Sequence, residues 1–347
     1  MNKTTLDAAA LAQLDRHGLD PDTYKVALGS ALLWTYRSQT ELHRLLSLSG
    51  LATHTGKAFS AADVKIAISE LRRKDLLVDD PMRPAGFQLV DALRAPLYRQ
   101  LLETHAGDRL ARLVGECEQL DQARIRTSYY WPDGSIPSTI AYVRAKFLSG
   151  APKEELTHIR TTIARSMEWG SVLTKALLLA FDGPSFARIE PHWRWQIAYQ
   201  AVATICLYWS NDFDPVADWA FAQLAEHPDE LIVELRAVLG DLALLRGDRP
   251  SFELAVRGLN NPLISAMRAA QLVIDGQWAE GQAAFEAALK ERKAAVGGNK
   301  HLVPRSYAWL YPLALLAQQT PRHLELARKF CLVESGRREP HPHEAWG

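Results

Sequence analysis

The stretch FSAADVKIAISELRRKDLLVDDPMRPAGFQLV, residues 59–90, predicts a capped helix followed by two short strands. Ser60 and Asp63 form an S-x-x-D start, a variant of the capping box that begins many helices. Apolar residues then recur at the i, i+3, i+4, i+7 spacing of one helical face. The pattern predicts a helix over residues 61–74, and its buried face consists of Val64, Ala67, Ile68 and Leu71.

A β-hairpin is expected after this helix. Two short apolar runs, residues 76–78 and 87–90, lie on either side of a turn that contains Pro81, Pro84 and Gly86. Apolar runs around such a turn are typical of paired strands, and these are the only two strands that the sequence predicts.

Two helices are expected before the stretch. One opens at Pro21, between two aspartates, and runs to about Trp34. The other is capped by Ser38 or Thr40 and closes at Gly50. Helices followed by a helix and a hairpin predict a winged-helix-like module, which we assign to residues 1–105.

Residues 106–347 alternate between helical patterns and short breaks. In residues 269–289, a helix, a Gly-bearing turn and a second helix with small residues at close-packing positions resemble a tetratricopeptide hairpin, and residues 242–255 repeat this less clearly. The breaks fall near Gly107, 132–134, 150–152, 183–184, Pro191, 214–215, Pro228, 247–250, 260–262, Gly276, 297–298 and 320–321. The expected fold is therefore mainly α: a winged-helix-like N-terminal module with a short β-hairpin, then a degenerate tetratricopeptide-like helical-repeat array.

The composition narrows the class of protein. The chain has 347 residues with 40 Lys plus Arg and 40 Asp plus Glu, so its formal net charge is zero and any DNA contact must come from a local patch. Three well-separated cysteines, Cys117, Cys206 and Cys331, are expected to be buried thiols in a reducing cytoplasm. No signal peptide and no membrane-spanning apolar run is recognised, so we expect a soluble cytoplasmic protein without a membrane partner.

Motifs for catalysis or metal binding are not found. Residues 50–58 are similar to a phosphate-binding loop, but five residues separate the glycines and Ala58 replaces the hydroxyl residue that would reach magnesium. His341, His343 and Glu344 would bind a metal adventitiously at most. We therefore expect this chain to have no catalytic residue, no metal, no cofactor and no small-molecule substrate.

The outer face of the predicted helix 61–74 is the candidate DNA-binding surface. In a winged helix, outward side chains of the second packed helix reach DNA. Lys65, Ser69 and Arg72 share one outward stripe, and Arg73 lies just beyond it. The cationic surface for phosphates would comprise Lys57, Lys65, Ser69, Arg72, Arg73 and, in the wing, Arg83.

A protein contact at the same surface is an open alternative. Residues 37–103 carry about ten basic and about eight acidic residues, and Asp79 follows the arginines closely. Ile66 also faces outward beside Glu70, which suits a protein contact better than a DNA groove.

Aromatic clusters at 193–195 and at Tyr208 and Trp209 suggest stacking on single-stranded nucleic acid. Because Trp193 and Ile197 share helical stripes with other apolar residues, we favour core packing for both clusters.

The run PRSYAWLYPLALL at 304–316, followed by LARKF at 326–330, resembles the helical N-terminal region of large bacterial Swi/Snf-type helicases. Residues 59–77 are similar to winged-helix domains generally. The resemblance implies helices that precede an ATPase motor, although neither a Walker A motif nor an Asp-Glu-x-His box occurs in this sequence. It also implies that the chain is the N-terminal part of a longer protein, and the helix-like start at 344–347 favours the same expectation.

Two functional hypotheses follow. The chain is either a non-catalytic recognition or regulatory region of a larger DNA-directed ATPase, binding DNA, a partner protein or the downstream motor, or a stand-alone adaptor that binds a protein or peptide. In the second hypothesis the winged helix is purely structural. An enzymatic activity of this chain is disfavoured because no convergent nucleophile, base or metal ligands can be assembled.

Overall fold

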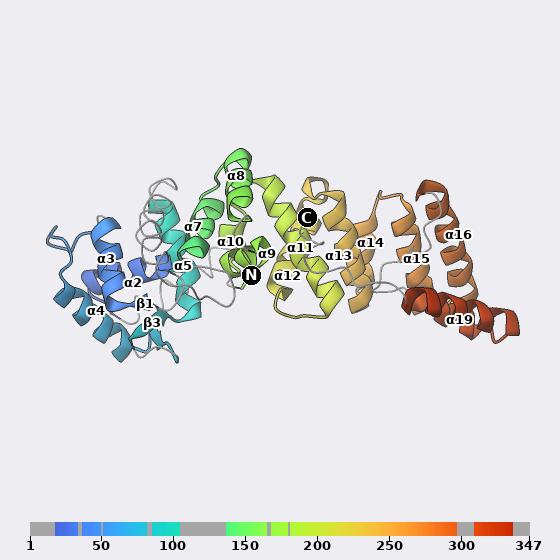
Figure 1. The fold of residues 1–347 in the computed structure, drawn as a ribbon, viewed down its shortest axis with the longest axis horizontal. Helices are drawn as coiled ribbons and strands as arrows, with labels where there is room; N and C mark the ends of the chain where they lie inside the picture. Colours follow the sequence, from blue (N-terminus) through green and yellow to red (C-terminus); the bar gives the residue numbers. More distant parts are fainter. Residues whose placement is uncertain are drawn as a thin grey trace. The chain divides into compact units, whose positions relative to one another are not determined.

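The computed structural model describes residues 18–33, 37–49, 51–81, 85–104, 137–164, 168–179, 181–296 and 309–335. This part of the chain is mainly helical and contains one short antiparallel sheet, as the sequence predicts (Figure 1). The chain divides into two compact units, residues 1–194 and 195–347. The boundary expected between residues 105 and 106 falls where residues 105–136 lie outside the described part, so it stays a prediction.

The first unit begins with helices around a small sheet. The sheet has the order β1-β3-β2 with antiparallel pairing throughout, and Leu77 lies opposite Leu89. The elements are α2 (Pro21–Leu33), β1 (Arg37–Ser38), α3 (Gln39–Ser49), α4 (Ala61–Arg73), β2 (Leu77–Asp79), β3 (Gly86–Leu89) and α5 (Asp91–Thr104). The predicted hairpin is confirmed as β2 and β3, but a third strand, β1, joins it and was not predicted.

Helix α4 begins as the sequence predicts. The Ser60 hydroxyl accepts from the Asp63 amide at 3.2 Å, and the Asp63 carboxylate accepts from the Ser60 amide at 2.8 Å. The predicted inner face is confirmed, since its four apolar residues are buried. Helix α2 packs against α3, α4, α5 and β3, so it forms the centre of this core.

Helix α3 is capped by Ser38, the first of the two predicted alternatives. The Ser38 hydroxyl accepts from the Glu41 amide at 3.3 Å, and the Glu41 carboxylate accepts from the Ser38 amide at 2.8 Å. Ser38 therefore belongs to β1 and caps α3 at once, which places the strand directly against the helix.

The rest of the first unit is helical and is packed around aromatic rings. Phe147 lies 6.0 Å from Trp169 and 5.7 Å from Trp193, measured between ring centroids. The elements are α7 (Pro137–Leu148), α8 (Lys153–Ile163), α9 (Trp169–Leu173), a π-helical turn (Thr174–Leu178), α10 (Gly183–Phe186) and the first residues of α11 (Pro191–Tyr208).

Arg144 on α7 is buried against the π-helical turn. Its guanidinium donates to the carbonyl oxygens of Lys175 at 2.8 Å and of Ala176 at 2.7 Å. Burial lowers the pKa of Arg144 to about 10, so the side chain is charged at neutral pH. It thus provides hydrogen-bond donors to carbonyl groups in the irregular turn.

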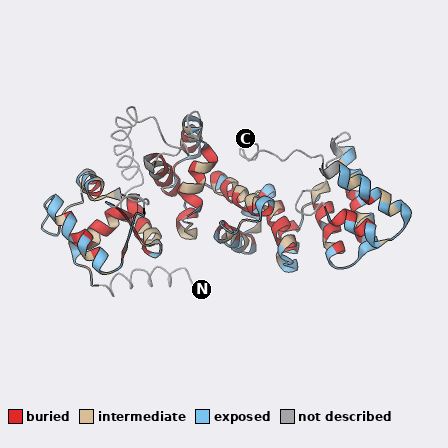
Figure 2. Cartoon of the chain, turned by 60° about the horizontal axis from the view of Figure 1, so that its bottom comes forward, coloured by how far each residue is buried: buried red, intermediate tan, exposed pale blue. Residues whose placement is uncertain are grey.

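The second unit consists of helices joined by short connections. Helices α13 and α14, α15 and α16, and α18 and α19 pack as consecutive pairs. Buried residues line the inner faces of these helices, and exposed residues lie on the outer faces (Figure 2). Besides α11, the elements are α12 (Asp214–Glu226), a 3-10 turn (Pro228–Glu230), α13 (Val233–Arg246), α14 (Arg249–Val256), α15 (Pro262–Ile274), α16 (Trp278–Val296), α18 (Leu310–Ala317) and α19 (Pro321–Ser335).

The predicted breaks within the described residues separate these helices or mark where one begins. The small residues expected at close-packing positions of α16 are confirmed only in part, since Ala288 is buried but Ala283 and Ala287 are exposed. The close approach of α15 and α16 is at Gly281, which the sequence pattern did not single out. A Cβ atom on Gly281 would lie 2.5 Å from Val273 Cγ2 and 3.1 Å from the Val273 amide nitrogen. Helix α16 therefore approaches α15 more closely there than any residue with a side chain allows.

Two remaining expectations concern cysteines and membranes. Cys206 is buried as predicted, but Cys331 is exposed on α19, which corrects the prediction of buried thiols; Cys117 lies outside the described residues. None of the helices among the described residues is long and apolar enough to cross a membrane.

Candidate functional site

The outward side of α4 carries most of the residues that the sequence singled out. Lys65, Ile66, Ser69, Glu70 and Arg73 line a shallow depression, which we call the α4 outer face. Ile66 is 68% exposed, so its predicted outward orientation is confirmed. Arg83, the candidate in the wing, lies outside the described residues.

Arg72 does not point freely into solvent. Its Nε and Nη2 atoms donate to Asp79 Oδ1 at 3.0 and 2.7 Å, and its guanidinium lies 5.5 Å from the centroid of the Phe87 ring. The side chain therefore ties α4 to both strands of the hairpin, and its charge is balanced by Asp79.

Arg73 is paired within its own helix. Its Nε and Nη2 atoms donate to the two Glu70 oxygens at 2.9 and 2.6 Å, and Lys74 Nζ lies 3.4 Å from the same carboxylate. Hydrogen bonds from Arg73 lower the pKa of Glu70, so this carboxylate is ionised at neutral pH. The arginine and the glutamate form an ion pair beside Ile66, so Lys65 is the cation of the depression that has no carboxylate partner among the described residues.

The remaining candidates differ in what they offer a ligand. The Ser69 hydroxyl donates to the Lys65 carbonyl oxygen at 2.9 Å, within its own helix. Lys57 and Lys65 are exposed and form no ion pair with other described residues. The structure thus brings five of the six candidates to α4 and its N-terminal approach, but leaves two uncompensated cations.

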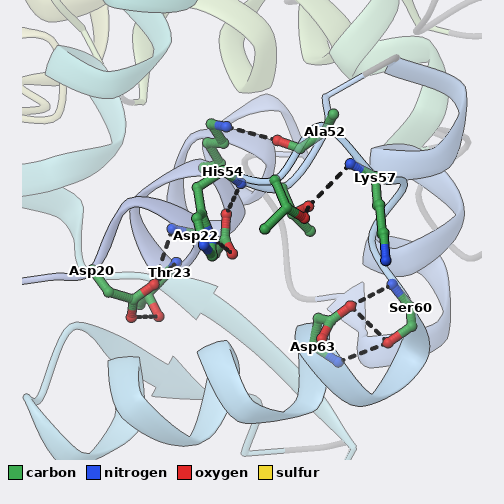
Figure 3. A network of polar contacts seen from close by, with 11 residues as sticks. Asp20, Asp22, Thr23, Ala52, His54, Lys57, Ser60 and Asp63 are labelled. Atoms are coloured by element: carbon green, nitrogen blue, oxygen red, sulfur yellow. Dashed lines mark hydrogen bonds and ion pairs between the residues drawn. The ribbon is translucent and has the colours of Figure 1, made fainter.

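The loop before α4 is held in a defined conformation (Figure 3). The Thr53 amide donates to the Lys57 carbonyl oxygen at 2.8 Å, and Gly56 takes a left-handed φ of 79° between them. Asp22 on α2 accepts from the His54 amide at 2.5 Å, and its other oxygen lies 2.7 Å from His54 Nδ1. These contacts fix the position of Lys57 and of the α4 N-terminus. The Thr53 and Gly56 amides are used within the loop, so it lacks the converging free amides of a phosphate-binding loop.

Glu70 and Asp79 are the carboxylates at the candidate site whose pairing with Arg73 and Arg72 the sequence analysis did not predict. The i, i+3 spacing of Glu70 and Arg73 is a recognisable signal for a helical ion pair. The pairing of Arg72 with Asp79 depends on where the hairpin folds back, which local sequence does not specify.

The aromatic clusters behave in two ways. Trp193 and Trp195 are buried, as predicted. Tyr208 and Trp209 are exposed, so the core-packing interpretation is wrong for these two residues. They lie at the C-terminal end of α11, where the helix has no further turn to cover them.

Among the residues that the structure describes, no group of three or more His, Cys, Asp and Glu side chains is placed to hold a metal ion. His341, His343 and Glu344 lie outside that part of the chain. Comparison of the chain with protein-family models, with curated proteins and with solved structures finds no match. The functional interpretation therefore depends on the side chains of this protein.

Proposed function

We propose that this chain is a non-catalytic recognition protein whose α4 outer face binds a partner protein. The observation that carries the proposal is Ile66, a large aliphatic side chain that is 68% exposed and lines a shallow depression. Burying such a side chain against a partner contributes about 1.5–3 kcal/mol. Apolar centres rimmed by polar residues are typical of protein interfaces.

The rim of the depression supports protein binding over DNA binding. Arg73 and Glu70 form a mutual pair beside Ile66, and Arg72 is balanced by Asp79. Phosphate recognition needs cations whose charge is available. A partner protein instead gains from an exposed apolar side chain next to a polar rim, in which Lys65 is the only lining cation without a carboxylate partner among the described residues.

The module that carries α4 is, in our proposal, a winged helix. The element order helix, strand, helix, helix, strand, strand, with β1 added to the hairpin, supports this assignment. We likewise propose that the second unit is a tetratricopeptide-like array, which the consecutive packing of α13 to α16 supports.

A second candidate function is DNA binding by the same module. It is favoured by two exposed lysines, Lys57 in the loop before α4 and Lys65 within α4. In the wider proposal, based on the sequence resemblance alone, the chain is the recognition region of a larger ATP-dependent, DNA-directed helicase or translocase. The stand-alone adaptor remains the alternative.

The test is to place a photo-cross-linking amino acid at position 66 in cells that express the protein. We expect discrete adducts with one partner protein, identified by mass spectrometry. The interaction, remeasured with the purified partner, should weaken at least tenfold in Ile66→Asp. A matched control is Val78→Asp on β2, since Val78 is also an exposed β-branched residue of the module.

Both variants should keep the helical circular dichroism of the wild type, because both side chains point into solvent. Equal loss of partner binding in the two variants would contradict a specific role of α4. Cross-links from position 66 to nucleic acid alone would favour the DNA candidate instead.

A further inference from the structure

Three consecutive apolar residues are exposed where α11 ends. Tyr208 is 55% exposed and Trp209 is 67% exposed, and Leu207 before them is also exposed. Together with Asp212 in the following loop, we call them the α11 cap. Contiguous exposed apolar side chains of this size mark an interaction surface more often than single scattered ones.

The backbone of Trp209 is in an unusual conformation. Its φ is 55°, and its amide donates to the Ile205 carbonyl oxygen at 2.8 Å as the helix terminates. A Cβ atom is strained at such a left-handed position. Glycine therefore normally fills it, or asparagine, whose short side chain can form local hydrogen bonds. A large aromatic side chain is thus kept at a position where its backbone is unfavourable, which points to a role for the ring itself.

The loop after Trp209 is ordered. The Asp212 amide donates to the Ser210 hydroxyl at 3.2 Å, the Asp214 amide donates to the Asn211 carbonyl oxygen at 3.2 Å, and Phe213 is buried. The ring therefore projects from a fixed turn, and a ligand that binds it need not order the loop.

The charge beside the α11 cap is negative on balance. The loop after α11 and the first turns of α12 carry three carboxylates, Asp212, Asp214 and Asp218. Asp214 and Asp218 share Arg246, at 2.7 and 3.4 Å, whereas Asp212 is exposed and has no cationic partner among the described residues. The carbonyl end of α11 adds partial negative charge at the same place.

This combination selects the kind of ligand. A guanidinium or ammonium group binds the face of Trp or Tyr, and nearby carboxylates strengthen that attraction. The same carboxylates repel phosphate, so the field opposes the nucleic-acid stacking that the aromatic pair alone would suggest.

We propose that the α11 cap is a docking site for an arginine- or lysine-bearing segment of a partner protein, with the cation held between the aromatic rings and Asp212. The site lies within the second unit, so it is independent of the α4 outer face and of the function proposed for it.

The test uses fluorescein-labelled hexa-arginine and fluorescence anisotropy at about 50 mM salt, where charge screening is weak. We expect saturable binding by the wild type, weakened about fivefold or more in Trp209→Gly, the usual range for one desolvated cation–π contact. Asp212→Asn should also weaken binding and reduce its salt dependence. The matched control is Trp278→Ala, because Trp278 is 42% exposed at the start of α16, and its affinity should equal that of the wild type.

Thermal unfolding separates a binding role from a structural one. Glycine relieves the left-handed strain, so Trp209→Gly should keep or raise the Tm while it loses affinity. A lowered Tm together with unchanged affinity would assign Trp209 a structural role and overturn the proposal. Absence of hexa-arginine binding by the wild type, or tighter Trp209-dependent binding of single-stranded oligothymidylate, would overturn it as well.

Discussion

At the scale of single residues, Ser60 is the clearest case in which one side chain fixes the position of a functional surface. Its hydroxyl accepts from the Asp63 amide and sets the first turn of α4. We expect Ser60→Ala to lower the free energy of unfolding of the first unit by about 1 kcal/mol, the usual cost of losing an N-cap. Urea denaturation followed by circular dichroism measures the change.

The control for this prediction is Ser69→Ala on the same helix. The Ser69 hydroxyl donates to a carbonyl oxygen of its own helix and is exposed, so its loss should change stability by less than about 0.5 kcal/mol. Hydrogen bonds from Ser60 lower the pKa of Asp63 below its ordinary value of 3.8. The contribution of Asp63 to stability is therefore present above pH 3.8 and is lost as the pH falls through the lower folded pKa. Equal effects of the two substitutions at neutral pH would contradict the capping role.

Residues whose environment follows from periodicity could be predicted. The inner face of α4 and the outward direction of Ile66 follow from 3.6-residue spacing alone. Trp209 could not be predicted in this way, because the rule for helix ends expects glycine or asparagine at a left-handed position. Cys331 was also mispredicted, since the general tendency of cysteine to be buried says nothing about which face of α19 it occupies.

At the scale of elements, the pair α15–α16 depends on one close approach. We expect Gly281→Ala to destabilise the second unit by about 1–3 kcal/mol, because the added methyl group would overlap Val273. Thermal unfolding of the purified protein measures the loss as a lower Tm.

The double variant Gly281→Ala/Val273→Ala is the control, because it removes the Cγ2 atom that the new methyl group would meet. The double variant should lose less stability than the sum of the losses in the two single variants, because the overlap with Cγ2 is gone. Its loss should still exceed that of Val273→Ala alone, because the new methyl group also lies close to backbone atoms of α15. Strict additivity of the two substitutions would show that the helices do not meet at this position.

Helices and the hairpin could be predicted, but β1 could not. Capping residues and Gly/Pro breaks mark helix ends in the local sequence, and two apolar runs mark β2 and β3. Strand β1 has only two residues, Arg37 and Ser38, and its pairing with β3 uses backbone groups. Nothing in two polar residues distinguishes such a strand from a loop.

At the scale of the whole molecule, the net charge of zero conceals an uneven distribution. The seven carboxylates of residues 195–235 are not balanced within that segment, whereas cations and anions alternate on α4. The sequence shows this imbalance of charge along the chain, but only the fold shows that Trp209, in the same segment, is exposed. The sequence could not show that Arg72 and Arg73 are balanced by carboxylates, because that pairing depends on the hairpin and on side-chain geometry.

This distribution leads to a prediction for DNA. We expect binding to a 30-base-pair duplex to be weaker than about 10⁻⁵ M at about 150 mM salt, because only Lys57 and Lys65, of the four described cations at and before α4 that we consider for DNA, have no carboxylate partner among the described residues. Fluorescence anisotropy over a salt series measures this affinity.

The variant Lys57→Glu/Lys65→Glu tests DNA contact more directly than one that changes Arg72, since replacing Arg72 would also break its contacts with the hairpin. The matched control is Arg268→Glu/Arg322→Glu, which makes the same change in net charge at two exposed positions of the second unit. Both double variants should bind as weakly as the wild type. Tight, salt-dependent binding that only the first variant abolishes would make DNA the ligand of α4, because a neutral molecule can bind DNA in that manner only through a local patch.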